Sequence, residues 1–266
     1  MKIRLSLVAA LLLLLSSGLR AEEATTTAVK IKPKSSATHS TRSAHEGGVQ
    51  PDTDVIDAPT TAVLDNYGYS ARSRFYSRGG LLQYLSFGVY PGINLGASAA
   101  IDGLIGDERH VRMRAPNAQV KYRFYEGDND FPSVAVGFDG QGYNYNSGIR
   151  RFNQRQRGFF VVASKELGLP GVQLHPSFNV SDFDSNSIFG SLPLSINIRD
   201  KASILLEWDN IANWSDSRFN LGVRAYMTPN FHVDFAVRAI GAGGFYSDGG
   251  SRGPERIVQL KYSNSF

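Results

Sequence analysis

The chain contains no cysteine, so no disulfide can hold its fold together. An exported protein of this size without disulfides needs another source of stability, either a large core or a barrel closed in lipid. Long apolar runs are also missing. After the first 21 residues, no segment approaches the roughly 20 apolar residues that a spanning helix requires. Any insertion of the remaining chain into a membrane must therefore occur as a β-barrel.

Residues 1–21 have the order of regions found in a secretory signal peptide. Basic residues precede an apolar run at 5–15, and small or polar residues follow it. This run is too short to span a bilayer, which disfavours a membrane anchor. We expect cleavage after Ala21, with a cut after Gly18 as the alternative. The absence of cysteine excludes a lipoprotein anchor.

Charge of one sign is not in marked excess. The formal net charge is +4, but three of the basic residues, Lys2, Arg4 and Arg20, belong to the signal peptide. The mature chain is therefore close to neutral. Bulk charge identifies no partner class and gives no indication of nucleic-acid binding.

Residues 22–61 lack aromatic residues altogether and are rich in Thr, Ser, Ala, Lys and Pro. A segment of this composition cannot bury enough apolar surface to offset the entropy lost on ordering. We expect a disordered arm in the periplasm. A plug or a partner-binding peptide is the functional alternative.

Aromatic residues and an alternation of period two characterise residues 62–266. The segments 118–124, 172–180, 219–227 and 231–239 each place apolar side chains on one face and mainly polar ones on the other. No stretch shows the 3.6-residue period of a helix. The predicted fold class is all-β: a transmembrane antiparallel up-and-down β-barrel with about twelve strands.

The lengths of the connections decide which face points outward. Short and long connections alternate along the chain, as in outer-membrane barrels with short periplasmic turns and long external loops. This pattern predicts the cell outer membrane of a Gram-negative bacterium, with both ends of the barrel domain on the periplasmic side. The strands are expected near 67–76, 81–90, 93–101, 117–125, 132–143, 157–166, 171–181, 188–198, 202–210, 217–227, 231–240 and 256–266.

The last strand resembles the C-terminal signal by which the barrel-assembly machinery recognises outer-membrane proteins. It ends in Phe266 and carries Tyr262 on its apolar face. Asn264 departs from the apolar residue expected at that position. We expect Tyr262 and Phe266 to form the insertion signal.

Five segments of the barrel domain carry a resemblance to a known family. They are GLLQYLSFGVYPGINLGASAAIDGLIGD, PNAQVKYRFYEGDNDFPSVAVGFDGQGY, GFFVVASKEL, SILLEWDN and RFNLGVRAYMTPNFHVDFAVRAIG. Their order resembles the YjbH-like outer-membrane proteins associated with exopolysaccharide production, over most of residues 62–266. The resemblance implies a single barrel unit, because this chain is far shorter than the long members. It also implies a non-enzymatic role in the export or assembly of surface polysaccharide.

Catalytic chemistry is weakly supported. His175 and Ser177 share one strand face, but residues two apart lie near 7 Å from each other, too far for an easy hydrogen bond. Glu207 and Asp209 share the inward face of another strand, as an acid–base pair for glycoside cleavage would. Polar side chains in a barrel interior explain both pairs without catalysis. We expect no catalytic residue, no cofactor and no metal.

Two predicted external loops are basic, and so is the predicted interior. A basic rim would contact the phosphates of outer-membrane lipids and lipopolysaccharide, or an anionic polysaccharide in transit. Such a barrel would be narrow or plugged, since twelve strands lie between a filled and an open barrel. The rim residues are Arg109, Arg112, Arg114, Arg150, Arg151, Arg155 and Arg157, and the inward charges include Arg72, Arg74, Lys121, Arg123, Glu207, Asp209, Arg224, Asp234, Arg238 and Lys261.

Three functions remain open on this reading. The first is surface-polysaccharide export or assembly, which rests on the resemblance and the basic rim. The second is a small passive, porin-like channel with a mild anion preference, which the inward Arg and Lys residues motivate. The third is an outer-membrane lipid or glycan hydrolase.

Overall fold

The structure is a computed structural model, and its fold is all-β. In the part of the chain that it describes, no helix is long and apolar enough to cross a membrane. The predicted signal peptide lies outside the described residues, as do residues 22–49 of the predicted arm. The described residues are 50–106, 111–146, 148, 151–154, 158–181, 188–212, 217–247 and 249–266.

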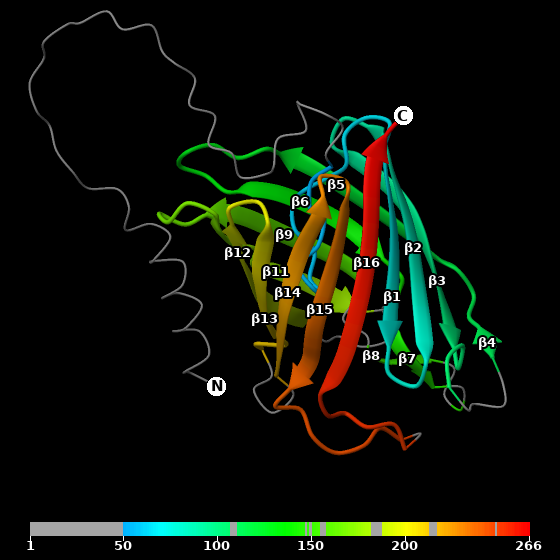
Figure 1. Cartoon of the computed structure of the whole chain (residues 1–266). Helices are drawn as coiled ribbons and strands as arrows, with labels where there is room; N and C mark the ends of the chain where they lie inside the picture. Colours follow the sequence, from blue (N-terminus) through cyan, green and yellow to red (C-terminus); the bar gives the residue numbers. More distant parts are fainter. Residues whose placement is uncertain are drawn as a thin grey trace, which may run out of the picture. The chain divides into compact units, whose positions relative to one another are not determined.

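Twelve antiparallel strands close into a barrel, which confirms the predicted fold class (Figure 1). Each strand pairs with its neighbours in sequence, and β16 closes the barrel by pairing with β1. The strands are β1 (Gly68–Tyr76), β2 (Gly80–Tyr90), β3 (Ile93–Asp102), β5 (Asn117–Tyr125), β6 (Ser133–Asp139), β9 (Gly158–Glu166), β10 (Val172–Leu174) continued by β11 (Ser177–Ser181), β12 (Ile188–Ile198), β13 (Ala202–Asp209), β14 (Arg218–Thr228), β15 (Phe231–Ile240) and β16 (Glu255–Ser265).

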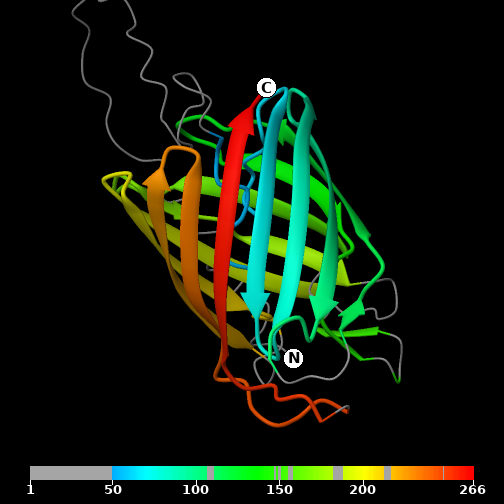
Figure 2. The same cartoon turned by 45° about the vertical axis from the view of Figure 1, so that its right-hand side comes forward.

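Connections are sorted between the two ends of the barrel, as their lengths predict. One end, here named the turn end, carries the C-terminus and short turns such as 91–92 and 229–230 (Figure 2). The other, the loop end, carries the long connections. Two of these contain short additional strands: β4 (Arg112–Met113) pairs with β3, and β7 (Tyr143–Asn146) pairs with β8 (Arg151–Gln154).

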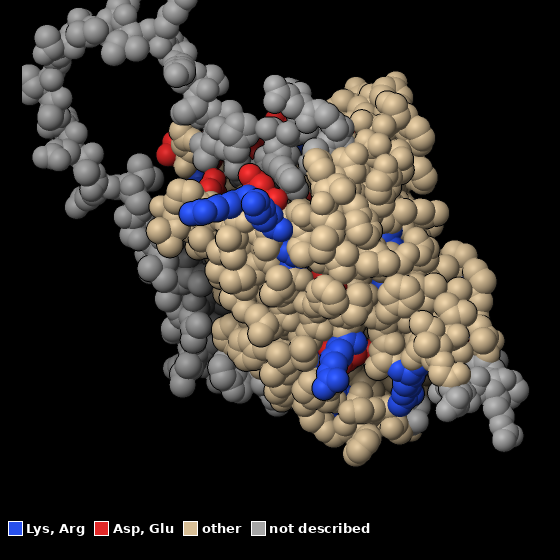
Figure 3. All heavy atoms as spheres, viewed as in Figure 1, with Lys and Arg blue, Asp and Glu red and all other residues tan. Residues whose placement is uncertain are grey.

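Side chains are distributed as lipid requires. Apolar residues of the strands point outward and stay exposed, including Phe87, Leu95, Phe219 and Phe235. The buried side chains are instead mostly polar or charged, the reverse of a water-soluble protein. On the face shown in Figure 3, few charged side chains reach the surface of the barrel wall. The barrel is therefore transmembrane.

Two predicted strands differ in detail from those observed. The strand expected over 171–181 is interrupted between β10 and β11, where Pro176 has no N–H to donate to a neighbouring strand. The backbone oxygen of Pro176 still accepts from Ala163, so the barrel stays closed across the break. The strand expected to reach residue 143 ends at Asp139, and Tyr143 begins β7.

The predicted arm differs more fundamentally. Residues 50–61 are folded and largely buried inside the barrel rather than disordered in the periplasm (Figure 2). Composition missed this because the segment is held mainly by hydrogen bonds and charges from the barrel wall, with only a small apolar contact. The position of residues 50–61 is the one that the alternative, a plug, would have.

Arginine in place of Val223 tests which face meets lipid. Val223 is 46% exposed on the outward face of β14. An arginine near the bilayer midplane costs about 2–4 kcal/mol, but about 0–1 kcal/mol near an interface. Val223→Arg should therefore lower the yield of the heat-modifiable, inserted form. Thr228→Arg, at the exposed end of the same strand, is the matched control and should insert normally; equal yields for the two variants would refute the assignment.

Candidate functional site

The interior of the barrel is filled by residues 50–66, named here the plug segment, which leads directly into β1. Its tip is a tight turn: the amide of Val55 donates to the oxygen of Ala58 at 3.0 Å, and that of Thr60 to the oxygen of Thr53 at 3.1 Å. Backbone-to-backbone hydrogen bonds within the segment are few. The wall must therefore supply partners for most of the remaining backbone groups.

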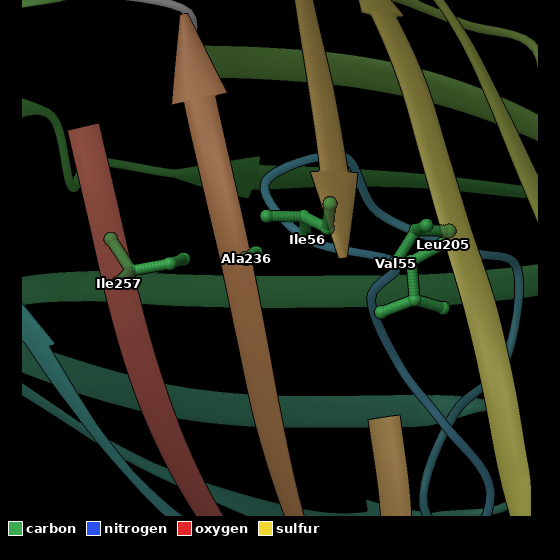
Figure 4. Packing of buried hydrophobic residues seen from close by; sticks show 5 residues of the cluster. All are labelled: Val55, Ile56, Leu205, Ala236 and Ile257. Atoms are coloured by element: carbon green, nitrogen blue, oxygen red, sulfur yellow. The ribbon is translucent and has the colours of Figure 1, made fainter. Parts of the chain in front are cut away.

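A small apolar contact orients the tip. Val55 lies against Leu205 of β13, and Ile56 lies beside Ala236 of β15 (Figure 4). Gly222 of β14 makes room, because a Cβ atom there would lie 3.2 Å from Cδ1 of Ile56. The plug segment thus has a defined orientation against one side of the wall.

Glu207 of β13 binds the backbone of the tip. Its Oε1 accepts hydrogen bonds from the amides of Ile56, Asp57 and Ala58, at 2.6, 2.8 and 2.9 Å. Its Oε2 accepts a hydrogen bond from Asn220 at 2.8 Å. Three successive amides that converge on one oxygen form an anion-binding turn, and here the anion is a side chain of the wall.

Asp57 is held from the opposite direction. Its carboxylate pairs with the guanidinium groups of Arg74 on β1 and Arg238 on β15. Arg74 also donates to the backbone oxygen of Ile56, and Arg238 pairs with Glu255 at 2.8 Å. The tip is consequently clamped between an acidic and a basic part of the wall.

Two further wall cations bind backbone oxygens of the plug segment. Arg224 makes a bidentate pair with Asp234, both bonds at 2.9 Å, and donates to the oxygen of Val55 at 2.9 Å. Lys121 donates to the backbone oxygens of Thr53, Thr60 and Ala62 at 2.8, 3.1 and 3.1 Å. Buried carbonyls that lack strand partners are thus satisfied by long basic side chains.

Two acidic side chains of the plug segment, Asp52 and Asp54, have lowered pKa values. Burial alone would raise the pKa of the Asp52 carboxyl, but the nearby Arg224 and His232 hold it well below its ordinary range. Burial likewise opposes ionisation of Asp54, yet Arg72 and Lys261 keep the pKa of this carboxyl well below its ordinary range. Asp52 and Asp54 are therefore anions held by cations of the wall.

Little space remains around the plug segment. One cavity of about 80 Å³ borders Arg72, Lys121 and Lys261, and another of about 80 Å³ borders His175 and Tyr226. Since one water needs roughly 10–15 Å³ measured in this way, each cavity holds a few waters and no larger solute. Neither of these two cavities holds a hydrated sugar while the plug segment is in place.

The predicted inward charges all come from inward-facing strand positions. Arg72, Arg74, Lys121, Glu207, Arg224 and Arg238 contact the plug segment directly. Lys261 lies 3.8 Å from Asp52. Asp209 and Asp234 act through Asn220 and Arg224. Arg123 pairs instead with the exposed Glu126 at the turn end.

The predicted basic rim is only partly described. Arg112 is exposed on β4, whereas Arg114 pairs with Asp102 at 2.7 Å. The backbone of Arg151 belongs to β8. Arg109, Arg150, Arg155 and Arg157 lie outside the described residues. At the turn end, Tyr262 and Phe266 are 41% and 88% exposed, and their role as an insertion signal stays a prediction.

Neither candidate catalytic pair is arranged for chemistry. His175 bonds to Ser164 at 2.7 Å and to Ser195 at 3.1 Å, while Ser177 bonds to Ser191. Glu207 is occupied by the tip amides. Asp57, Glu207 and Asp209 are close enough to hold a cation, but Asp57 and Glu207 already bind arginines and amides, respectively. The cluster therefore serves the plug segment.

Sequence reasoning missed the acidic residues of the plug segment, Asp52, Asp54 and Asp57. A signal was present, because three acids fall within six residues just before a barrel with an excess of inward cations. Alternation could not reveal it, since the tip is neither strand nor helix.

Removal of the Asp57 charge should loosen the plug segment. Asp57→Asn leaves Arg74 and Arg238 without their shared carboxylate, and breaking a buried ion pair costs about 3–5 kcal/mol. We expect proteinase K to cut residues 50–64 of the inserted variant faster than those of the unaltered chain. Asp130→Asn, in an exposed turn, is the control. Equal cleavage of both variants would contradict the assigned role.

Comparisons with known proteins give the chain no family. No family model matches it, and no curated protein does. Among solved structures, it is similar to the KdgM porin, with 9% identity and a TM-score of 0.48 over 75% of this chain and 99% of that one. It is also similar to the NanC porin, with 12% identity and a TM-score of 0.42 over 74% and 99%. At these values the similarities carry no argument about function.

Proposed function

We propose that the protein is an outer-membrane channel of a Gram-negative bacterium, held closed by its own plug segment. In this orientation the turn end faces the periplasm and the loop end faces outward, following the rule of short periplasmic turns. The observation that carries the proposal is the bonding of the plug segment: it is attached to the wall almost entirely through polar side chains.

This mode of attachment suits a part that moves. An interior filled only to stabilise a barrel could be packed with apolar or short polar side chains from the strands themselves. Here the plug segment comes from outside the barrel strands. Its release would leave the strand pairing unchanged and would expose hydrophilic groups of the wall. The exposed wall would attract anions through Arg72, Lys121 and Lys261, which supports the expected mild anion preference.

A role in surface-polysaccharide export or assembly is a second proposal. It rests on a segment order that resembles the YjbH-like proteins and gains support from the interior cations, which suit an anionic polymer. The two roles are compatible, because a polymer would also need the plug segment to move. Secreted polysaccharide from a strain that lacks the gene separates this role from simple solute passage.

Conductance tests the closed state. Replacement of residues 52–60 by glycine and serine removes the three acidic anchors while keeping the chain length. In planar bilayers, the unaltered protein should conduct little, and the variant should conduct steadily, with anions favoured. A matched control replaces the exposed turn 126–130, which also carries three acids, and should stay closed. Steady conductance of the unaltered protein would overturn the proposal.

A further inference from the structure

The cavity beside Arg72, Lys121 and Lys261 has a feature that the bonding of the plug segment does not explain. Lys261 on β16 is 1% exposed, borders this cavity, and its Nζ has no hydrogen-bond partner. The carboxylate of Asp52 lies 3.8 Å away, which is an ion pair without a hydrogen bond. A buried ammonium with unmet hydrogen bonds is unfavourable, and it marks a position suited to an anionic acceptor.

Around these cations the wall is lined with neutral hydrogen-bonding groups. Ser70 of β1, Ser86 of β2, Asn94 of β3 and Gln119 of β5 all border the cavity. Three acids border it as well, but each is already bound. Asp54 pairs with Arg72, Asp57 pairs with Arg74 and Arg238, and Asp139 accepts hydrogen bonds from Gln119 and from the amide of Gln141. Hydroxyl and amide groups around a cation match a solute with both hydroxyls and a carboxylate.

The plug segment uses the same cations in the closed state. Arg72 pairs with the carboxylate of Asp54, and Lys121 is saturated by three backbone oxygens of the plug segment. An anionic solute and the plug segment would therefore compete for the same groups. With a volume of about 80 Å³, the cavity cannot admit a sugar unless the plug segment moves.

We propose that Arg72, Lys121 and Lys261 form a binding site for a carboxylate-bearing sugar, for which the acidic plug segment is the internal competitor. The inference rests on the proposed channel function and adds the solute class and its link to opening. Binding of the sugar acid stabilises the state in which the plug segment has left the cations, so the solute shifts the population toward the open channel.

The full-length protein in planar bilayers at fixed potassium chloride tests this inference. Sodium glucuronate should raise the open fraction and saturate, whereas glucose should have no effect. Lys261→Gln should need about tenfold more glucuronate for the half-maximal effect, because a charge-assisted contact is lost. Arg123→Gln removes the same charge from a lumen position that does not border the cavity, and should respond like the unaltered chain.

Several outcomes overturn the assignment. Opening by glucose as strong as that by glucuronate excludes this site. It is also excluded if Arg123→Gln and Lys261→Gln lose the same sensitivity to glucuronate. Opening by triglutamate at lower concentration than glucuronate shows that the site takes acidic peptides instead. If Lys261→Gln does not insert, the comparison of glucuronate with glucose on the unaltered chain decides. If no solute raises the conductance of the unaltered protein while the glycine–serine plug variant conducts, the inference is refuted but the channel function is not.

Discussion

The charged interior of the barrel is the constraint on which the rest of the structure depends. Arg74, Arg224 and Lys261 are among the largest fully buried side chains of the described residues. Charges removed from water in this way are tolerated only when opposite charges and hydrogen-bond partners surround them. Part of that compensation comes from wall acids such as Asp234, and the rest comes from the plug segment.

Barrel and plug segment therefore depend on each other. The plug segment has few internal hydrogen bonds and little apolar surface, so it has no reason to fold outside the barrel. The wall, in turn, holds guanidinium and carboxylate groups whose partners are the side chains and backbone of the plug segment. Glu207 and Asp57 show this reciprocity most clearly, since each is an acid bound by groups from the other part.

Much of the barrel could be predicted from the sequence because lipid imposes a strict alternation. In β14, outward Leu221 and Val223 flank the inward Gly222 and precede the inward Arg224, and the pattern alone indicates these faces. The alternating loop lengths likewise indicated the sorting of turns and loops. Because alternation repeats in every strand, an error in the bounds of one strand does not change the faces assigned in the others.

The contents of the lumen could not be predicted in the same way. Residues 50–61 have the composition of a disordered linker, and composition measures only the apolar surface that a segment can bury. Their burial depends instead on carbonyls that meet Lys121 and amides that meet Glu207, which no local pattern records. The break in the strand at Pro176 could not be predicted for a related reason. The neighbouring strands, and not the local sequence, decide how a proline is accommodated.

Cross-linking between the plug segment and the wall tests the central claim most directly, and the absence of native cysteine makes it unambiguous. A chain with Val55→Cys and Leu205→Cys, treated in outer membranes with a short bifunctional thiol reagent, should form an internal bridge that alters its migration on a denaturing gel. A chain with Val55→Cys and Val223→Cys should not, because Val223 faces lipid. Absence of the first bridge when both cysteines react singly, or equal bridging in the two chains, would contradict a plugged lumen.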